Sequence, residues 1–192
     1  SQSNNTIKCL GAAPPSADAM YKPVEDKEAH KEAMGFDKNV KFVGTVMRNQ
    51  KRKLFPDLFE TFRKFLDTSQ RKDVLLYPDL GWDIPKLLLK NNLSSKVVFT
   101  YVCSVCQHTF PAFFSDARRK CQNCNSFAAG LSSVQKGASC EYLASVMNLF
   151  DLYIQYASSE GFGLPQVEAA ACGVPVMSVD YSAMSSVVRK LG

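Results

Sequence analysis

Apolar residues follow two different spacings along this chain. Short runs rich in Val, Ile, Leu, Phe and Tyr alternate with longer segments in which apolar residues recur every three or four positions. The short runs have the length of buried strands, and the longer segments have the spacing of amphipathic helices. Strands are expected at residues 40–46, 73–77, 96–102, 151–155 and 174–179. Helices are expected at 55–67, 83–91, 139–149, 165–172 and 182–190, with a short one in the charged stretch 25–32.

The alternation of strands with helices predicts an α/β fold with a single doubly wound parallel sheet, Rossmann-like in architecture. A chain of 192 residues that is 46% hydrophobic can bury one core and carry a small appendage. We expect residues 1–39 to be a connector or entry segment. Residues 40–102 and 127–192 should form the Rossmann-like domain, and residues 103–126 should be an insertion in it.

The expected insertion contains two CxxC pairs, Cys103 with Cys106 and Cys121 with Cys124, with fourteen residues between them. Two such pairs can place four thiolates around one metal ion, the arrangement of a zinc ribbon. Four cysteine ligands leave no open coordination position, so the expected zinc is structural. An unmetallated loop is one competing interpretation, and a disulfide pair is the other. The odd total of seven cysteines and the lack of a secretory signal at the start of the chain argue against it.

The segment 158–178, SSEGFGLPQVEAAACGVPVMS, predicts a glycine turn, a helix and a buried strand. Pro165 suits the first helical position, and Gly173 suits the left-handed residue that ends a helix. Free N–H groups at the start of a helix bind anions, and the glycines of the turn allow a ligand to approach the backbone closely. The segment therefore predicts an anion-binding turn.

Two glutamates flank this turn, Glu160 and Glu168, with seven residues between them. Glu168 is expected in the first turn of the helix. Carboxylates beside an anion site can accept hydrogen bonds from sugar hydroxyls. The combination suits a nucleoside diphosphate sugar, and the alternative interpretation is an ordinary strand–helix unit with two solvated glutamates.

A second segment, residues 40–54, reads VKFVGTVMRNQKRKL. It predicts a buried strand, a glycine, then a basic loop that leads into an amphipathic helix. A pyrophosphate in a cleft needs cations of this kind when its bond to the sugar breaks. The alternative is that the basic residues are simply solvated.

These two segments resemble the donor half of retaining glycosyltransferases with the two-domain GT-B fold, in particular glycosyltransferase family 4. The resemblance covers roughly residues 35–190 and rests on the E-x7-E signature with EGFGLP, EA and ACGVPV in order. It implies that Glu160 faces the transferred sugar and that Glu168 accepts from the ribose hydroxyls. The N–H groups of Phe162, Gly163 and Leu164 would contact the sugar and the pyrophosphate.

The resemblance also implies that Arg48 and Lys53, after the strand that ends at Gly44, stabilise the leaving nucleoside diphosphate. Lys51 and Arg52 are equally basic neighbours, so the register of this assignment stays open. Relatives of this kind retain the anomeric configuration without a catalytic metal, and the chain contains no DxD motif. The cofactor expected from the sequence is therefore the structural zinc alone, with a nucleotide sugar as substrate.

The resemblance to GT-B enzymes is confined to their donor-binding half. We therefore expect an N-terminal acceptor-binding domain to be missing from this chain and the chain to be inactive without it. The nucleotide, the sugar and the acceptor are not identified by the sequence. No apolar run is long enough to span a bilayer, and the N-terminus has no signal-peptide core, so a cytoplasmic location is expected, compatible with a peripheral position at a membrane.

The leading alternative comes from another functional class. The zinc ribbon could bind nucleic acid or a protein partner on a Rossmann scaffold that no longer catalyses, and Arg118, Arg119 and Lys120 supply a small basic patch. The formal net charge of +5 is modest and does not call for a nucleic-acid partner.

Overall fold

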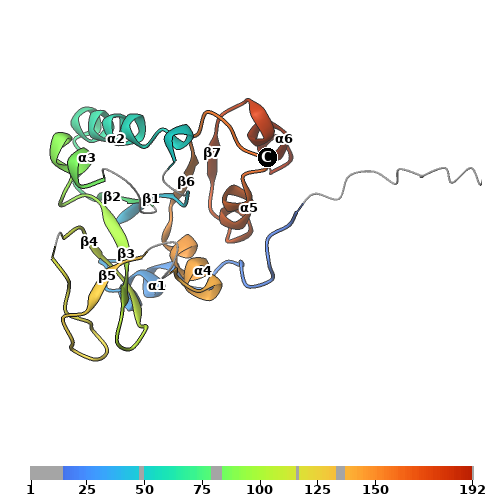
Figure 1. Ribbon diagram of the computed structural model, residues 1–192. Coiled ribbons are helices and arrows are strands. Elements are labelled where there is room, and N and C mark those ends of the chain that lie inside the picture. The colour runs from blue at the N-terminus through green and yellow to red at the C-terminus, as the bar shows by residue number, and fades with distance from the viewer. Residues whose placement is uncertain (1–14, 48–49, 79–83, 116, 133–136, 192) are drawn as a thin grey trace, which may run out of the picture.

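Two sheets organise the fold (Figure 1). The computed structural model describes residues 15–47, 50–78, 84–115, 117–132 and 137–191. Within these residues, the larger sheet has four strands: β1 (Lys41–Thr45), β2 (Val74–Pro78), β6 (Leu152–Gln155) and β7 (Val176–Ser178). The strands lie in the order β2-β1-β6-β7, and each neighbouring pair is parallel. The expected α/β fold with a Rossmann-like parallel sheet is confirmed.

Helices cover both faces of the parallel sheet. Figure 1 shows α2 (Phe55–Ser69) and α3 (Ile84–Lys90) on one side, with α1 (Lys27–Ala33) and α4 (Cys140–Leu149) on the other. Each side has its own buried cluster, one containing Phe59 and one containing Phe150. The remaining helical elements are η1 (Lys51–Lys53), α5 (Leu164–Ala171) and α6 (Ser182–Leu191). None of the helices within the described residues is long and apolar enough to cross a membrane.

The segment expected as a third parallel strand, 96–102, belongs mainly to the second sheet. Residues 98–103 form β3 (Val98–Cys103), which lies between β4 (Thr109–Phe113) and β5 (Ala129–Leu131), antiparallel to both. Within the described residues, an isolated parallel bridge links Leu76 of β2 to Val97, the residue just before β3. The prediction of a full parallel strand was wrong because β4 and β5 take the hydrogen-bonding groups on both edges of β3.

Helix α5 begins one residue earlier than expected. Gly163 is the N-cap in the left-handed conformation, with φ of 81°. Pro165 is therefore the second helical residue, a position that it tolerates because the N–H groups of the first turn have no intrahelical partner. Glu168 consequently lies in the second turn, so its expected place in the first turn was wrong. Gly173 ends the helix with φ of 74°, as predicted.

A buried ion pair ties the entry segment to the sheet. Lys31 of α1 is 2% exposed, and its ammonium lies 2.8 Å from Oδ2 of Asp151, just before β6. The same oxygen accepts a hydrogen bond of 2.9 Å from the backbone N–H of Phe42 in β1. The contacts place α1 against the end of the sheet opposite the loops that follow the strands.

Candidate functional site

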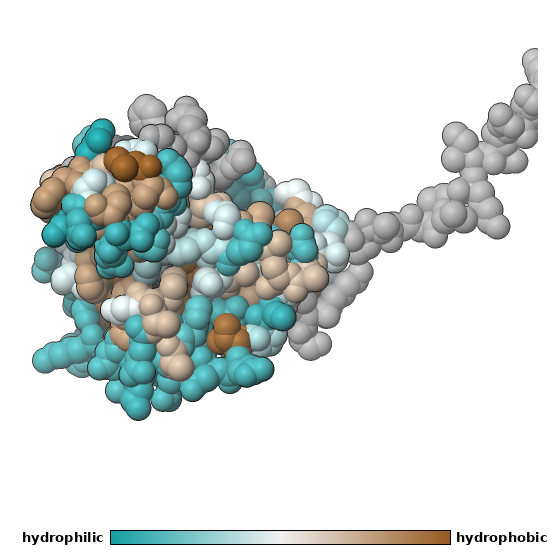
Figure 2. All heavy atoms as spheres, turned by 90° about the horizontal axis from the view of Figure 1, so that it is seen from below, coloured by the Kyte–Doolittle hydropathy of each residue, from teal (hydrophilic) through white to brown (hydrophobic). Residues whose placement is uncertain are grey.

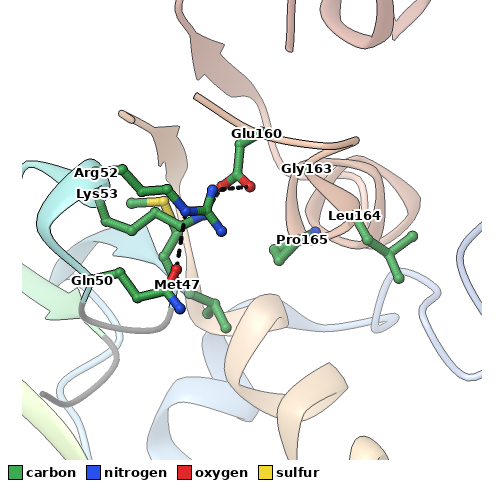
Figure 3. Close-up of a pocket in the computed structure, with 9 residues that line it drawn as sticks. Met47, Gln50, Arg52, Lys53, Glu160, Gly163, Leu164 and Pro165 are labelled. Atoms are coloured by element: carbon green, nitrogen blue, oxygen red, sulfur yellow. Dashed lines mark hydrogen bonds and ion pairs between the residues drawn. The ribbon is translucent and has the colours of Figure 1, made fainter. Parts of the chain in front are cut away.

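A cavity of about 310 Å³ opens where β1 and β6 end. Its lining comes from the loop after β1, from η1, and from the loop after β6 that leads into α5 (Figure 3). The carboxyl ends of parallel strands are where open α/β sheets bind ligands. The described lining residues are Val46, Met47, Gln50, Arg52, Lys53, Glu160, Gly163, Leu164 and Pro165.

Glu160 meets two cations at the wall of this cavity. Its Oε2 lies 3.0 Å from Nη1 of Arg52, and its Oε1 is paired with the ammonium of Lys53. The side chains of Glu160 and Lys53 are 9% and 7% exposed, whereas that of Arg52 is 42% exposed. Figure 3 shows both cations reaching from η1 towards the glutamate. Arg52 also donates to the carbonyl of Ser159 at 2.6 Å, which ties η1 to the loop after β6.

Burial changes the acidity of the inner cation. It lowers the pKa of Lys53 to about 8, and the neighbouring charge of Arg52 acts in the same direction. Lys53 is therefore charged at neutral pH and loses its proton well before an exposed lysine does. A cation held in this way has been stripped of much of its water, which favours binding of an anion.

The backbone geometry of the turn before α5 requires a glycine at position 163. Its φ of +81° is costly for any residue with a Cβ, and a Cβ there would lie 2.8 Å from Nε2 of Gln166. Gln166 is fully buried and its amide nitrogen lies 3.4 Å from the carbonyl of Phe162. Gly163, Leu164 and Pro165 line the cavity, so the start of α5 lies beside it. That this turn binds an anion stays a prediction.

The structure brings together only part of the set predicted from sequence. Glu160, Lys53, Gly163 and Leu164 line the cavity, and Arg48 lies outside the described residues. The residues Phe162, Glu168 and Gly44 are not among the described lining residues. Their roles in donor binding therefore stay predictions.

Glu168 and Gly44 have other contacts in the structure. Burial raises the pKa of Glu168, and a hydrogen bond from the hydroxyl of Tyr21 in the entry segment works against that rise. Gly44 lies in β1 under the ring of Phe150, and a Cβ there would be 2.1 Å from a ring carbon. At Gly44 the absence of a side chain is thus a packing requirement of the sheet.

Arg52 is a site residue that the sequence pointed to only as one of several neighbouring cations. The run from Lys51 to Lys53 forms a single 3-10 turn. Lys51 is exposed, while Arg52 and Lys53 turn towards Glu160. The basic run was a usable signal, but the choice within it depends on this turn.

The second group of functional interest is the cluster of four cysteines at one end of the small sheet. The Sγ atoms of Cys103, Cys106, Cys121 and Cys124 all lie within 4.8 Å of one another. The pairs Cys103–Cys124 and Cys106–Cys121 are each 3.6 Å apart. Sulfur atoms around a tetrahedral zinc, with Zn–S of about 2.3 Å, are about 3.8 Å apart. All four are free thiols, so the competing disulfide interpretation has no support here.

The two cysteine knuckles have the same backbone form. The N–H of Gln107 donates to the carbonyl of Cys103, and that of Asn125 donates to Cys121, both at 3.0 Å. Gln107 and Asn125 each adopt a left-handed conformation, with φ of 58° and 60°. Non-glycine residues rarely take this conformation, so its repetition after both CxxC pairs indicates two loops shaped for the same purpose.

Comparison with known proteins gives two findings. The fold is similar to that of solved GT-B glycosyltransferases, and residues 133–192 match the family described as Glycosyl transferases group 1. The matched segment contains α4 to α6 and both glutamates of the E-x7-E signature. No curated protein matches the chain in sequence.

Three solved structures illustrate the likeness in fold. WaaG, a glycosyltransferase of lipopolysaccharide biosynthesis, is 18% identical with a TM-score of 0.63, over 92% of this chain and 40% of WaaG. Sucrose-phosphate synthase from Thermosynechococcus elongatus is 19% identical with a TM-score of 0.61, over 91% of this chain and 36% of the enzyme. Anabaena HepE, in complex with UDP and glucose, is 15% identical with a TM-score of 0.55, over 88% and 37%. The chain thus spans less than half the length of these proteins.

Proposed function

We propose that this chain binds the nucleoside diphosphate sugar donor of a retaining glycosyltransferase. The observation that carries the proposal is the meeting of Glu160 with Arg52 and Lys53 beside the glycine turn of α5. A diphosphate requires cations and free N–H groups, and a sugar requires hydrogen-bond acceptors. The cavity offers all three kinds of group within one wall.

In the proposed reaction, the bond between the anomeric carbon and the diphosphate oxygen breaks, and a bond to an acceptor hydroxyl forms on the same face of the sugar. Negative charge then gathers on the leaving diphosphate. Arg52 and Lys53 are placed to neutralise it, and the N–H groups before α5 add to this stabilisation. Glu160 faces the sugar ring, and Glu168, backed by Tyr21, binds the ribose as the family resemblance implies. Arg48 is a proposed third cation.

The whole enzyme would need a second domain. In proteins of this fold the acceptor is bound by an N-terminal Rossmann domain, and the chain covers 40% of WaaG and 36% of sucrose-phosphate synthase. We infer that this chain is the donor-binding half and that transfer to an acceptor requires the other half. A cytoplasmic location is part of the same proposal.

The four cysteines would hold one structural zinc ion. The distances between their sulfur atoms fit a tetrahedral site, and the backbone N–H of Asn123 lies 3.4 Å from Sγ of Cys121, as in loops that stabilise thiolates. The zinc would cross-link the turn after β3 to the loop before β5. Four sulfur ligands give it no part in the transfer reaction.

One observation favours a second function for the ribbon. Val105, within the first CxxC pair, and Phe127, three residues after the second pair, are 66% and 73% exposed. The backbone N–H of Ser104 donates to the carbonyl of Ala128 at 3.1 Å, so the two apolar residues stand on adjacent loops. Figure 2, which views the molecule from below, shows hydrophobic colour gathered on this end of the molecule. This patch could contact a protein partner or nucleic acid, the alternative that the sequence left open.

Calorimetry on the purified chain tests the proposed function and separates it from the alternative. UDP is the first nucleotide to use because it is the ligand in HepE. We expect UDP and UDP-glucose to bind weakly, with uridine weaker still, because the cations contact phosphate. Mixed oligonucleotides at physiological salt should not bind. A panel of other nucleoside diphosphates tests whether the site prefers a base other than uracil. If none of them binds and oligonucleotides do, the ribbon is the functional element.

A further inference from the structure

A buried chain of two hydrogen bonds leads from the hydroxyl of Tyr153, on β6, through Gln155 to the back of Glu160. The hydroxyl of Tyr153 lies 3.2 Å from the carbonyl oxygen of Val46 and 2.7 Å from Oε1 of Gln155. Nε2 of Gln155 then donates to Oε1 of Glu160 at 2.9 Å. Tyr153 and Gln155 are both 0% exposed, so water does not compete for these bonds.

The chemistry of the groups fixes the direction of this relay. Tyr153 and Gln155 are two residues apart on β6, so their side chains point to the same face of the strand. The hydroxyl of Tyr153 donates to Oε1 of Gln155, which leaves the amide nitrogen facing Glu160. The reversed amide would set its oxygen against the carboxylate, with two acceptors and no proton between them. The relay therefore holds the glutamate by a donor that has no charge.

The absence of charge distinguishes Gln155 from the other partners of Glu160. Arg52 and Lys53 are strong partners, but they are also the proposed ligands of the diphosphate. A bound donor would draw both cations towards its phosphate oxygens and loosen their hold on the glutamate. Gln155 does not reach for phosphate in this way because it is fully buried behind the carboxylate.

We propose that Gln155, backed by Tyr153, is the positioning residue that keeps the Glu160 carboxylate aimed at the donor sugar when the diphosphate engages Arg52 and Lys53. The inference rests on the proposed function, since the task it assigns to Gln155 arises only in the donor complex. Among the residues that the structure describes, the charged groups paired with Glu160 are Arg52 and Lys53 from η1. The hydroxyl of Ser182, at the start of α6, lies 3.4 Å from the backbone N of Glu160.

The catalytic test uses the full-length enzyme and measures release of UDP from UDP-glucose as a function of pH. Gln155→Leu should lower kcat roughly ten- to a hundredfold, the usual effect of losing a hydrogen bond to a charged group, with a much smaller change in KM. Gln155→Glu is the informative variant. Two facing carboxylates share a proton as the pH falls, and the protonated new side chain can donate to Glu160 again. Its turnover, relative to wild type, should therefore recover between pH 8 and 6, while that of Gln155→Leu should not.

A merely structural role for Gln155 would not give this pH-dependent recovery. Tyr153→Phe should show a smaller loss of kcat than Gln155→Leu, because the amide remains but is no longer oriented. The proposal is overturned if Gln155→Leu turns over like wild type, or if Gln155→Glu and Gln155→Leu have parallel pH profiles. Thermal unfolding of each variant shows whether a loss reflects misfolding.

A second measurement on the present chain does not depend on turnover. The side-chain amide protons of Gln155, assigned by their loss in Gln155→Leu, should exchange with water at least tenfold more slowly than those of exposed Gln122. Slow exchange should persist when UDP is added and should be lost in Glu160→Leu, which removes the acceptor of this hydrogen bond. Fast exchange in the free protein, or its onset with bound UDP, contradicts the proposal. If UDP does not bind, the proposed function fails, while the free protein still shows whether the relay exists.

Discussion

Lys53 and Glu160, which lie far apart in the sequence, form an ion pair in which each side chain is less than a tenth exposed. Arg52 shares the same carboxylate from the more exposed side. The two cations proposed to bind phosphate are thus already paired with a carboxylate of the same site, which offsets one of their two positive charges. A diphosphate that enters the cavity has to compete with Glu160 for them, and this competition can be measured.

Replacing Glu160 with Gln should therefore strengthen binding of UDP to the chain, by roughly three- to tenfold, because the variant removes a competing anion from Arg52 and Lys53. Glu168→Gln is the matched control: it removes a carboxylate of the same signature that has no ion pair with either cation. This control should instead weaken the binding of UDP, because it removes the proposed contact with the ribose. Calorimetric titration of both variants decides the matter. Weaker binding of UDP by Glu160→Gln would mean that the carboxylate organises the cations for phosphate.

Binding of UDP should weaken as the pH rises through about 8, because that is the pKa to which burial lowers Lys53. Lys53 is charged below this pKa and neutral above it. Its attraction for phosphate is therefore complete near pH 6.5 and mostly lost near pH 9.5. Lys53→Arg should keep its charge over this whole range and flatten the profile. The Kd for UDP, measured between pH 6.5 and 9.5, tests this. Equal slopes for wild type and Lys53→Arg would assign the titration to another group.

Purified protein should contain about one zinc ion per chain, bound by Cys103, Cys106, Cys121 and Cys124. Cys121→Ser should lose the metal and increase hydrogen exchange in residues 103–131, while the four parallel strands stay protected. Cys140→Ser is the matched control, because Cys140 is an exposed free thiol outside the cluster. Metal analysis and exchange mass spectrometry provide the readouts. Retention of zinc by Cys121→Ser would remove this residue from the ligand set.

Gly44→Ala should destabilise the domain, because the new Cβ would lie 2.1 Å from the ring of Phe150. Forcing such an overlap in a packed core typically costs about 1–3 kcal/mol of the free energy of unfolding. Combining it with Phe150→Leu should recover part of the loss, as a double-mutant cycle of denaturant unfolding would show. Gly161→Ala, where a Cβ meets no atom within 4 Å, is the control and should unfold like wild type. A stable Gly44→Ala that fails to bind UDP would instead support the role in donor binding.

Asp151→Asn should lower the free energy of unfolding by about 3 kcal/mol at neutral pH, because it leaves the buried ammonium of Lys31 without its counter-ion. Burial works against the charged form of Asp151, but the hydrogen bonds from Lys31 and from the backbone of Phe42 hold the pKa of this carboxyl below its usual value. Its stabilising contribution is therefore present above about pH 4 and is lost as the pH falls further. The difference in the free energy of unfolding between wild type and Asp151→Asn, measured with urea, should therefore be smaller at pH 3 than at neutral pH. An equal difference at both pH values would contradict this linkage.

The sequence by itself determined most of the secondary structure and identified the E-x7-E signature of Glu160 and Glu168. Helices such as α2 and α4 were predictable because apolar residues at helical spacing leave one buried face. The end of α5 at Gly173 depends only on the left-handed conformation that glycine adopts easily. The paired CxxC knuckles were equally local, since each knuckle is defined within a few residues.

The tertiary structure alone decided which groups meet. Residues 98–103 have the composition of a parallel strand, but their neighbours β4 and β5 compete successfully for the same backbone groups. The run from Lys51 to Lys53 contains three similar cations. Only the 3-10 turn and its position opposite the loop after β6 select Arg52 and Lys53 as partners of Glu160. The contact of Glu168 with Tyr21 likewise joins two segments that no local pattern connects. Periodicity fixes which face of an element is buried, whereas the partner of a polar side chain depends on the path of the whole chain.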